Sequence, residues 1–482
     1  MQSSLYARSI GDLRPGVLEK STANHLIRSF VSAPHHRFDG ESEHFEASDV
    51  THVWAHRVGV NALALDEFDG RFLVSGGADG AIRFWDLHDS SSPRRPHTFR
   101  PRAEVLRAVR ENDSGHTHGI THLDFHPLHA DAFLSSSFDR SIKLWSADRL
   151  AVSESFDLGS LIYSHATSPR RNHLMVACAT GHSAVRLVDL RTGSSVQALA
   201  SQGGAVLSVA WSPRGDNVLA SGHMDGRVRV WDIRRGVALI GMLDQDDSLG
   251  LVHHYDHAVA SGSGWDASRP RFRASARAHD DGVNGLCWTQ DGQYVVSAGL
   301  DERIRVWDAA TGANTLASFG SVVRNQSHHG PIGTASMFVS PSCLTPSRGE
   351  LLFWANGQEV LVFDLHEGTV VSRLRVVGAP HSTNAAGLNV RNRITDMVWR
   401  GAGGKGVQGG VVMGGGSSVG GLYTAHSDGQ IRAWMPRLPG LEDDDDPGED
   451  PTEEEDEQSR TRKRKAVDDA FRSLMGRQIT FR

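Results

Sequence analysis

The stretch HDDGVNGLCWTQDGQYVVSAGLDERIRVWD, residues 279–308, decides the fold of this chain. It reads as three short strands joined by tight turns, because alternating β-branched and apolar residues are bounded by Asp- and Gly-containing turns. Three strands of about five or six residues cannot bury a core by themselves. The stretch therefore predicts that similar units occur elsewhere in the chain and pack beside it.

A fixed spacing of three residue types marks these units. An Asp lies six residues before a Trp, and a Ser or Thr lies four residues before that Asp. Five units share the spacing: Ser75, Asp79 and Trp85; Ser135, Asp139 and Trp145; Ser221, Asp225 and Trp231; Ser297, Asp301 and Trp307; Thr424, Asp428 and Trp434. Three of the units also have an upstream histidine: His56, His116 and His279. The pattern resembles the WD-repeat family, whose repeats each supply a four-stranded blade of a β-propeller.

Histidine, hydroxyl and carboxylate are also the groups of a hydrolytic triad. A triad occurs once per active site, whereas this set recurs in unit after unit, each time with a tryptophan. The recurrence therefore predicts a structural hydrogen-bond chain from Asp through His and Ser or Thr to the Trp indole. We expect no catalytic residue, no cofactor and no metal site.

Two further units are degenerate. One has other residues at the Ser, Asp and Trp positions: Cys178, His182 and Val188. The other ends in Phe363, and the unit ending in Trp231 has Gln202 where others have histidine. With these units the chain is predicted to be all-β, a seven-bladed WD-repeat β-propeller.

The boundaries of the propeller are predicted at residues 49 and 436. Asp49–His56 alternates like a strand, and we expect it to supply the outer strand of the last blade and so close the ring. The last blade is predicted to be interrupted by a glycine-rich insertion at 401–421, and a longer insertion at 236–278 separates the fourth and fifth blades.

Composition narrows the class of protein. The chain has 482 residues, of which 39% are hydrophobic and 22% charged, as in an ordinary globular protein. No apolar run is long enough for a membrane helix, and the N-terminus does not read as a signal peptide. Three widely spaced cysteines indicate a reducing compartment. We therefore expect an intracellular protein without a membrane segment.

Both termini carry segments outside the repeats. Residues 1–48 are predicted to hold a helix–loop–helix, Leu5–Arg8 and Val17–Asn24, with a frayed terminus as the alternative. Residues 437–482 are predicted to be a disordered tail, acidic at 442–457 and then basic. The basic cluster predicts a nuclear import signal, with solvated charge as the alternative: Arg462, Lys463, Arg464 and Lys465.

One motif points to a docking function. In Trp231-Asp232-Ile233-Arg234 the arginine follows the third strand, on the face opposite the loops that join successive blades. There a planar, permanently charged guanidinium can bind carboxylates or backbone carbonyls of a docked protein. The degenerate third blade ends similarly, in Asp189-Leu190-Arg191.

Several stretches read together resemble the Cockayne syndrome group A family of WD-repeat proteins. They are HRVGVNALALDEFDGRFLVSGGADGAIRFWDL (56–87), FLSSSFDRSIKLW (133–145), LIYSHATSP (161–169), DGVNGLCWTQDGQ (281–293) and GANTLASFG (312–320). The resemblance covers most of residues 1–436. The chain departs from that family in its two insertions and in its extended tail.

This resemblance implies a nuclear, non-enzymatic substrate receptor of a cullin-4 RING ubiquitin ligase. It implies a role in DNA damage repair, in transcription-coupled nucleotide excision repair at stalled RNA polymerase II, with a Cockayne group B-type ATPase as partner. It also implies contact with the damaged-DNA-binding adaptor subunit through the N-terminal segment and the Arg box. The residues expected at that contact are Leu5, Arg8, Leu18, Arg191, Trp231, Asp232 and Arg234.

Two alternatives stay open. One is a general nuclear WD-repeat scaffold without a ligase. The other is direct binding to DNA, for which the arginine-bearing connections 94–110 and 269–277 offer limited support. The net charge of −7 is concentrated in the acidic tail and leaves the body nearly neutral, which does not favour sequence-independent DNA contact.

Overall fold

The structure is a computed structural model that describes most of residues 6–437. The residues within that range that it does not describe are 7, 12–13, 41–52, 67, 89–96, 110–113, 170–173, 236–237, 250–275, 326–332, 343, 346–348, 376–380, 384–388 and 402–420.

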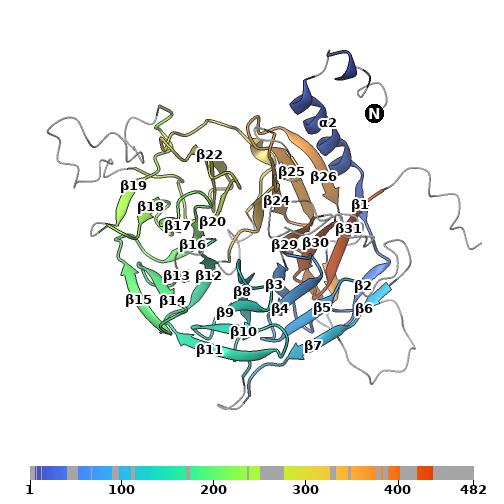
Figure 1. Ribbon diagram of the computed structural model, residues 1–482, viewed down its shortest axis with the longest axis vertical. Helices are drawn as coiled ribbons and strands as arrows, with labels where there is room; N and C mark the ends of the chain where they lie inside the picture. Colours follow the sequence, from blue (N-terminus) through green and yellow to red (C-terminus); the bar gives the residue numbers. More distant parts are fainter. Residues whose placement is uncertain are drawn as a thin grey trace, which may run out of the picture. The chain divides into compact units, whose positions relative to one another are not determined.

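Seven antiparallel sheets are arranged as blades around a common axis, which confirms the predicted seven-bladed propeller (Figure 1). From the axis outward, blade one consists of β3 (Val60–Leu65), β4 (Phe72–Gly77), β5 (Ile82–Asp86) and β7 (Pro101–Val105). Blade two consists of β8 (Ile120–Phe125), β9 (Ala132–Ser137), β10 (Ser141–Ser146) and β11 (Ala151–Asp157). Blade three consists of β12 (Ile162–Thr167), β13 (Met175–Thr180), β14 (Val185–Asp189) and β15 (Ser194–Leu199). Blade four consists of β16 (Val206–Trp211), β17 (Val218–His223), β18 (Val228–Asp232) and β19 (Leu239–Met242).

The remaining three blades are less regular. Blade five has three described strands: β20 (Val283–Trp288), β21 (Tyr294–Gly299) and β22 (Ile304–Asp308). Blade six consists of β23 (Met337–Val339), β24 (Leu351–Asn356), β25 (Glu359–Asp364) and β26 (Val370–Arg375). Blade seven consists of β29 (Ile394–Arg400), β30 (Gly421–His426), β31 (Ile431–Pro436) and β1 (Phe30–Ser32). The predicted blade ends therefore all lie on third strands.

The strand that closes the ring is β1, so the prediction that Asp49–His56 closes it is wrong. Phe30 pairs with Pro436 and Ser32 with Trp434, in antiparallel register. The amides of Ala55 and His56 instead both donate to the carbonyl of Gly429 in a turn. The apolar alternation of Asp49–His56 reads like a strand, but only a long-range pairing decides which segment completes blade seven.

One long helix precedes the closing strand. Helix α2 spans Pro15–Arg28 and lies outside the ring beside β26 and β1 (Figure 1). Pro15 occupies the first helical position, where its missing N–H would have had no partner in any case. The helix therefore begins at Pro15, two residues before Val17, the predicted start. The helix also continues past Asn24, the predicted end.

Smaller elements complete the described chain. A helical turn precedes α2, with the amide of Ile10 donating to the carbonyl of Tyr6. The others are a parallel pair, β2 (His36–Phe38) with β6 (His97–Phe99), a hairpin of β27 (His381–Thr383) and β28 (Asn389–Arg391), and the 3-10 turn Gly320–Val322.

The core lies between the blades. Trp145 of blade two shares an apolar cluster with Val74 of blade one, and Trp307 of blade five shares one with Val228 of blade four. Both tryptophans are fully buried. Each blade thus covers the apolar face of its neighbour, which is why a single repeat cannot fold alone.

Candidate protein-docking surface

Three blades contain the complete hydrogen-bond chain. In blade two, the Trp145 indole donates to Ser135 Oγ over 2.7 Å, and Ser135 Oγ lies 2.6 Å from His116 Nε2. His116 Nδ1 lies 2.8 Å from Asp139 Oδ2. The same contacts join Trp85, Ser75, His56 and Asp79 in blade one, and Trp307, Ser297, His279 and Asp301 in blade five.

The direction of the chain follows from the chemistry of its ends. An indole N–H can only donate, so Ser135 accepts from Trp145 and its own hydroxyl is free to donate to His116 Nε2. His116 then donates its Nδ1 proton to Asp139. Burial lowers the pKa of His116, although Asp139 opposes this. Burial raises the pKa of Asp139, but the hydrogen bonds from His116 and Ser141 outweigh it and leave that pKa low. The set is a neutral imidazole held by a carboxylate, repeated in three blades.

Blades four and seven build the chain differently. In blade four, Ser221 Oγ accepts from the Trp231 indole over 2.7 Å and lies 2.8 Å from Nε2 of His223, two residues further along the same strand. In blade seven, Thr424 makes the same contacts with Trp434 and His426. Sequence reasoning missed both histidines.

In these two blades the turn aspartates pair with arginine instead of histidine. Asp225 lies 2.9 Å from the Arg229 guanidinium, and Asp428 lies 2.9 Å from that of Arg432. The signal was present in the sequence as Ser-x-His-x-Asp and Thr-x-His-x-Asp, with an arginine four residues after the aspartate.

The ends of the third strands lie on one face of the propeller, which we call the docking face. It also carries the turns from first to second strands, because neighbouring strands are antiparallel. On this face, the side chain of Asp232 is 1% exposed and accepts from both Nε and Nη2 of Arg234, at 3.2 and 3.1 Å. The Arg234 side chain is 60% exposed. A buried carboxylate thus fixes the direction of an exposed guanidinium.

The Asp232 and Arg234 side chains hold each other in the charged form. Burial raises the pKa of Asp232, but the hydrogen bonds and charge of Arg234 outweigh it and hold that pKa low. Arg191 of blade three is exposed, and its amide donates to Asp189 over 2.9 Å. Trp231 is buried in the network of blade four. The prediction that Trp231 and Asp232 themselves contact an adaptor is therefore wrong, because both are covered by their own blade.

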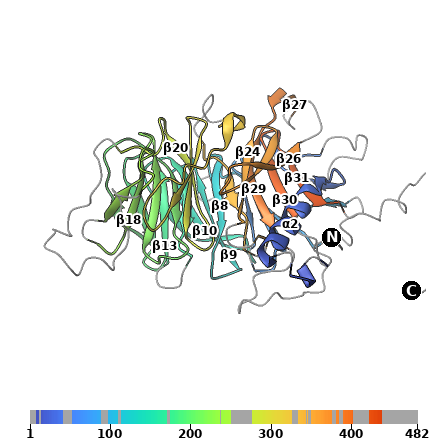
Figure 2. The same ribbon diagram turned by 90° about the horizontal axis from the view of Figure 1, so that it is seen from above.

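Helix α2 is anchored to the same face. Lys20 Nζ lies 2.7 Å from Asp364 Oδ2, at the end of the third strand of blade six, and 3.4 Å from Glu367. The Arg28 Nε donates to the carbonyl of Val371 over 3.3 Å. Figure 2 shows the helix along the edge of the ring. The docking face therefore holds both Arg234 and the anchored end of the N-terminal segment.

The N-terminal segment presents apolar side chains to solvent. They are Tyr6, Ile10, Val17 and Leu26. Leu18 is only 5% exposed and faces into the fold, so the prediction that Leu18 contacts an adaptor is wrong. Its neighbour Val17, 56% exposed, takes the outward position, since adjacent helical residues point in different directions. Arg8 is exposed.

Other predicted features lie outside the described residues. These are Leu5, most of the insertion 236–278, nearly all of the glycine-rich insertion 401–421, and the tail beyond residue 437 with its basic cluster Arg462–Lys465. Among the described residues, no three His, Cys, Asp or Glu side chains gather as a metal site would require. Nor does any helix in the described part have the length and apolarity to cross a membrane.

Comparison with known proteins identifies the repeats. Four segments match the WD40 family, described as WD domain, G-beta repeat: residues 48–86, 109–146, 193–232 and 271–308. These segments contain the Trp residues of blades one, two, four and five.

Two kinds of relatives are similar over about half of the chain. The WD repeat-containing protein ATCSA-1 of Arabidopsis thaliana is 29% identical over 314 residues, which cover 55% of this chain and 70% of that protein. The ribosome biogenesis protein ytm1 of Aspergillus terreus is 26% identical over 274 residues, 53% of this chain and 54% of that protein. The corresponding YTM1 protein of Phaeosphaeria nodorum is 25% identical over 275 residues, 53% of this chain and 55% of that protein. The chain thus spans about half the length of the ytm1 relatives.

Proposed function

Because this chain is a WD-repeat protein with a seven-bladed propeller, we propose that it is a non-enzymatic substrate-recognition subunit of a cullin-4 RING ubiquitin ligase. In this proposal it acts in the nucleus, in transcription-coupled nucleotide excision repair at stalled RNA polymerase II. Its adaptor is the damaged-DNA-binding subunit of the ligase. A Cockayne group B-type ATPase and the polymerase complex are the further partners.

One observation supports the proposal most directly: the exposed Arg234 guanidinium is oriented by the buried Asp232 on the face to which α2 is anchored. A preoriented guanidinium loses little conformational freedom when it binds a carboxylate or carbonyl of a docked protein. The exposed apolar residues of the N-terminal segment, such as Tyr6 and Val17, add surface that an apolar groove can bury. Together they form a two-part docking surface.

The proposed mechanism is proximity. The adaptor binds the docking face and the N-terminal segment, and the opposite face holds the protein to be ubiquitinated. Fixing target and ubiquitin-charged enzyme on one assembly raises their effective concentration without any chemistry in the propeller itself. The segments 1–48 and 437–482 serve, in this proposal, as adaptor-docking segment and as a tail that carries the import signal.

A second candidate function is scaffolding in ribosome assembly, without a ligase. The similarity to the ytm1 ribosome biogenesis proteins over 274 residues favours it. It would use the same docking face for a different partner.

Affinity capture separates the two candidates. The tagged chain, Arg234→Ala, Val17→Asp and a control, Arg303→Ala, are each used to capture partners from nuclear extract, and the partners are identified by mass spectrometry. Arg303 is an exposed arginine in the turn between β21 and β22, on the face opposite the docking face. The ligase proposal expects the adaptor and cullin-4 with the wild type and with Arg303→Ala, but much less with the other two variants. Ribosome precursors in place of the ligase would favour the second candidate and overturn the first.

A further inference from the structure

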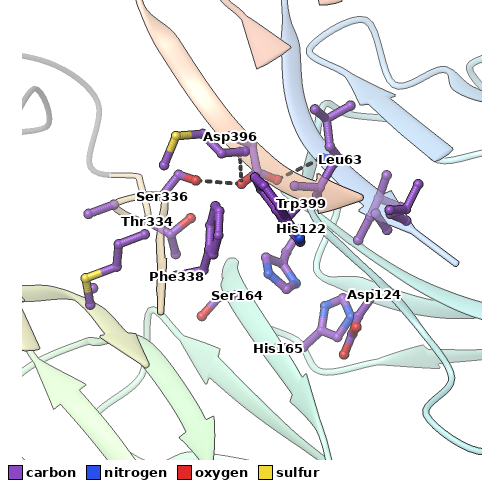
Figure 3. Close-up of a pocket in the computed structure, with 18 of the residues that line it drawn as sticks. Leu63, His122, Asp124, Ser164, His165, Thr334, Ser336, Phe338, Asp396 and Trp399 are labelled. Atoms are coloured by element: carbon purple, nitrogen blue, oxygen red, sulfur yellow. Dashed lines mark hydrogen bonds between the residues drawn. The ribbon is translucent and has the colours of Figure 1, made fainter. Parts of the chain in front are cut away.

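A cavity of about 450 Å³ lies on the propeller axis and is lined by residues from the first strands of all seven blades. Figure 3 shows side chains from several blades pointing into it, among them Asp396 and His122. The lining also includes Asp66 and Gly70, which belong to the turn between β3 and β4. Since that turn lies on the docking face, the cavity opens toward this face. Its volume suits a side chain or small ligand.

The charge of the lining has one sign. Three carboxylates line the cavity, those of Asp66, Asp124 and Asp396, and the described lining includes no lysine or arginine. Asp124 accepts from the Thr167 hydroxyl over 2.7 Å. Asp396 accepts from the amide of Leu63 and, over 2.9 Å, from the Ser336 hydroxyl. Asp124 and Asp396 are thus held in place by hydrogen bonds from neighbouring blades, and the carboxylates favour a cation over an anion.

Several polar atoms at the cavity have no hydrogen-bond partner among the described residues. They are Ser164 Oγ, His165 Nε2, His122 Nδ1 and Trp399 Nε1. Ser164 is 5% exposed and His165 is 2% exposed. Buried polar atoms are nearly always paired in proteins, so this group leaves unused hydrogen-bonding capacity in the wall of the cavity. It is independent of the carboxylates.

Aromatic rings form part of the wall. The rings of His122 and His165 meet edge to face with centroids 4.7 Å apart. Phe338 stacks on Phe353 with centroids 4.6 Å apart, and its side chain is drawn in the cavity beside Trp399 (Figure 3). Rings of this kind attract a flat cation through their π faces.

We infer that this cavity binds one arginine side chain of a partner protein that docks on the same face. A guanidinium is planar, weakly hydrated and rich in N–H donors, so it can stack on Phe338 or Trp399 and donate to a lining carboxylate such as Asp396 or Asp124. An ammonium is more strongly hydrated and fits a partly apolar cavity less well. Burial raises the pKa of Asp396 to about 6, and a bound cation would lower that pKa again.

The inference does not depend on the proposed ligase function, because it is tested with a peptide and not with the adaptor. The probes are acetyl-Gly-Ala-Arg-Ala-Gly-amide and the same peptide with citrulline, which has nearly the same shape as arginine but no charge. Binding to the full chain is measured by isothermal titration calorimetry. We expect saturable binding of the arginine peptide, and at least about tenfold weaker binding of the citrulline peptide.

Three variants locate the binding. Asp396→Asn and Asp124→Asn should each lower the affinity for the arginine peptide by about tenfold or more. Asp148→Asn is the matched control, since Asp148 is exposed in the turn after β10, on the same face but outside the cavity. It should change the affinity by less than about twofold. Circular dichroism checks folding, and if Asp396→Asn does not fold, Asp124→Asn decides alone. No binding to the folded wild type, equal binding of both peptides, or unchanged affinity in the folded cavity variants would overturn the inference.

Discussion

Lys20 of helix α2 places its ammonium nitrogen 2.7 Å from a carboxylate oxygen of Asp364, at the end of the third strand of blade six. The hydrogen bond to Asp364 raises the pKa of Lys20. Burial raises the pKa of Asp364, but Lys20 and backbone amides outweigh it and lower that pKa. Asp364 occupies in blade six the position that Asp232 has in blade four, and in both blades it holds a basic side chain. The pair fixes α2 to the docking face.

Replacing Lys20 should loosen α2. In Lys20→Met the 3% exposed Asp364 side chain loses its cation, while the helix keeps its apolar contacts. Because Lys20 is 31% exposed, solvent screening limits the loss of unfolding free energy to about 1 kcal/mol. Hydrogen exchange of the α2 amides should become faster. Glu19→Gln, at an exposed position of the same helix, should leave exchange unchanged. Equal exchange in wild type and Lys20→Met would contradict the anchoring role.

The closing strand β1 should contribute strongly to stability through one face only. Phe30 is 5% exposed and packs against Trp399 with ring centroids 5.5 Å apart, whereas Val31 is 44% exposed on the other side of the same strand. Phe30→Ala should lower the free energy of unfolding by about 3–4 kcal/mol, and Val31→Ala by less than about 1 kcal/mol. Urea titration followed by tryptophan fluorescence measures both. Similar small losses for the two variants would mean that β1 does not carry the closure.

The contribution of His223 to the stability of blade four can be compared with that of Gln202, which the sequence places where other blades have histidine. His223 is fully buried and bonded to Ser221, while the side chain of Gln202 is exposed and only its carbonyl accepts, from Arg229. His223→Ala should therefore cost about 2 kcal/mol, because it leaves a cavity and an unpaired hydroxyl. Gln202→Ala should be close to neutral. The reverse order in thermal unfolding would show that Ser221 has another partner.

The raised pKa of Asp396 should make the free energy of unfolding depend on pH. Burial raises its pKa in the folded chain to about 6 from the ordinary 3.8, so the folded state favours the protonated form. Its stabilising contribution is complete below pH 3.8 and is lost as the pH rises to about 6. The loss amounts to about 3 kcal/mol. The free energy of unfolding of Asp396→Asn relative to wild type should therefore rise across this window and stay level above it. A flat difference from pH 4 to 7, measured by urea titration, would contradict the raised pKa.

The local part of the fold was predictable from sequence. The spacing of Ser, Asp and Trp lies within one blade, so blade ends such as Trp85 and Val188 could be read without any partner. The closing strand could not, because both Phe30–Ser32 and Asp49–His56 carry strand-like residues. Only the pairing with β31, some four hundred residues away, separates them.

The candidate site was predictable only where the sequence motif is also exposed. The position of Arg234 follows from the Trp-Asp-Ile-Arg motif itself, since the chain leaves the third strand after Asp232. The covered positions of Leu18 and Trp231 depend on tertiary packing, which no local pattern records. The axial cavity collects residues from all seven blades, so its carboxylates are scattered through the sequence and had no recognisable motif.

The most direct test of the proposed function is the affinity of the purified chain for the purified damaged-DNA-binding adaptor subunit, measured by biolayer interferometry. The account predicts binding by the wild type and by Arg303→Ala, and at least about tenfold weaker binding by Arg234→Ala and by Val17→Asp. Val17 lies in the first turn of α2, where an aspartate does not disturb the helix. A folded wild type that does not bind the adaptor, or an Arg234→Ala variant that binds equally well, would contradict the account.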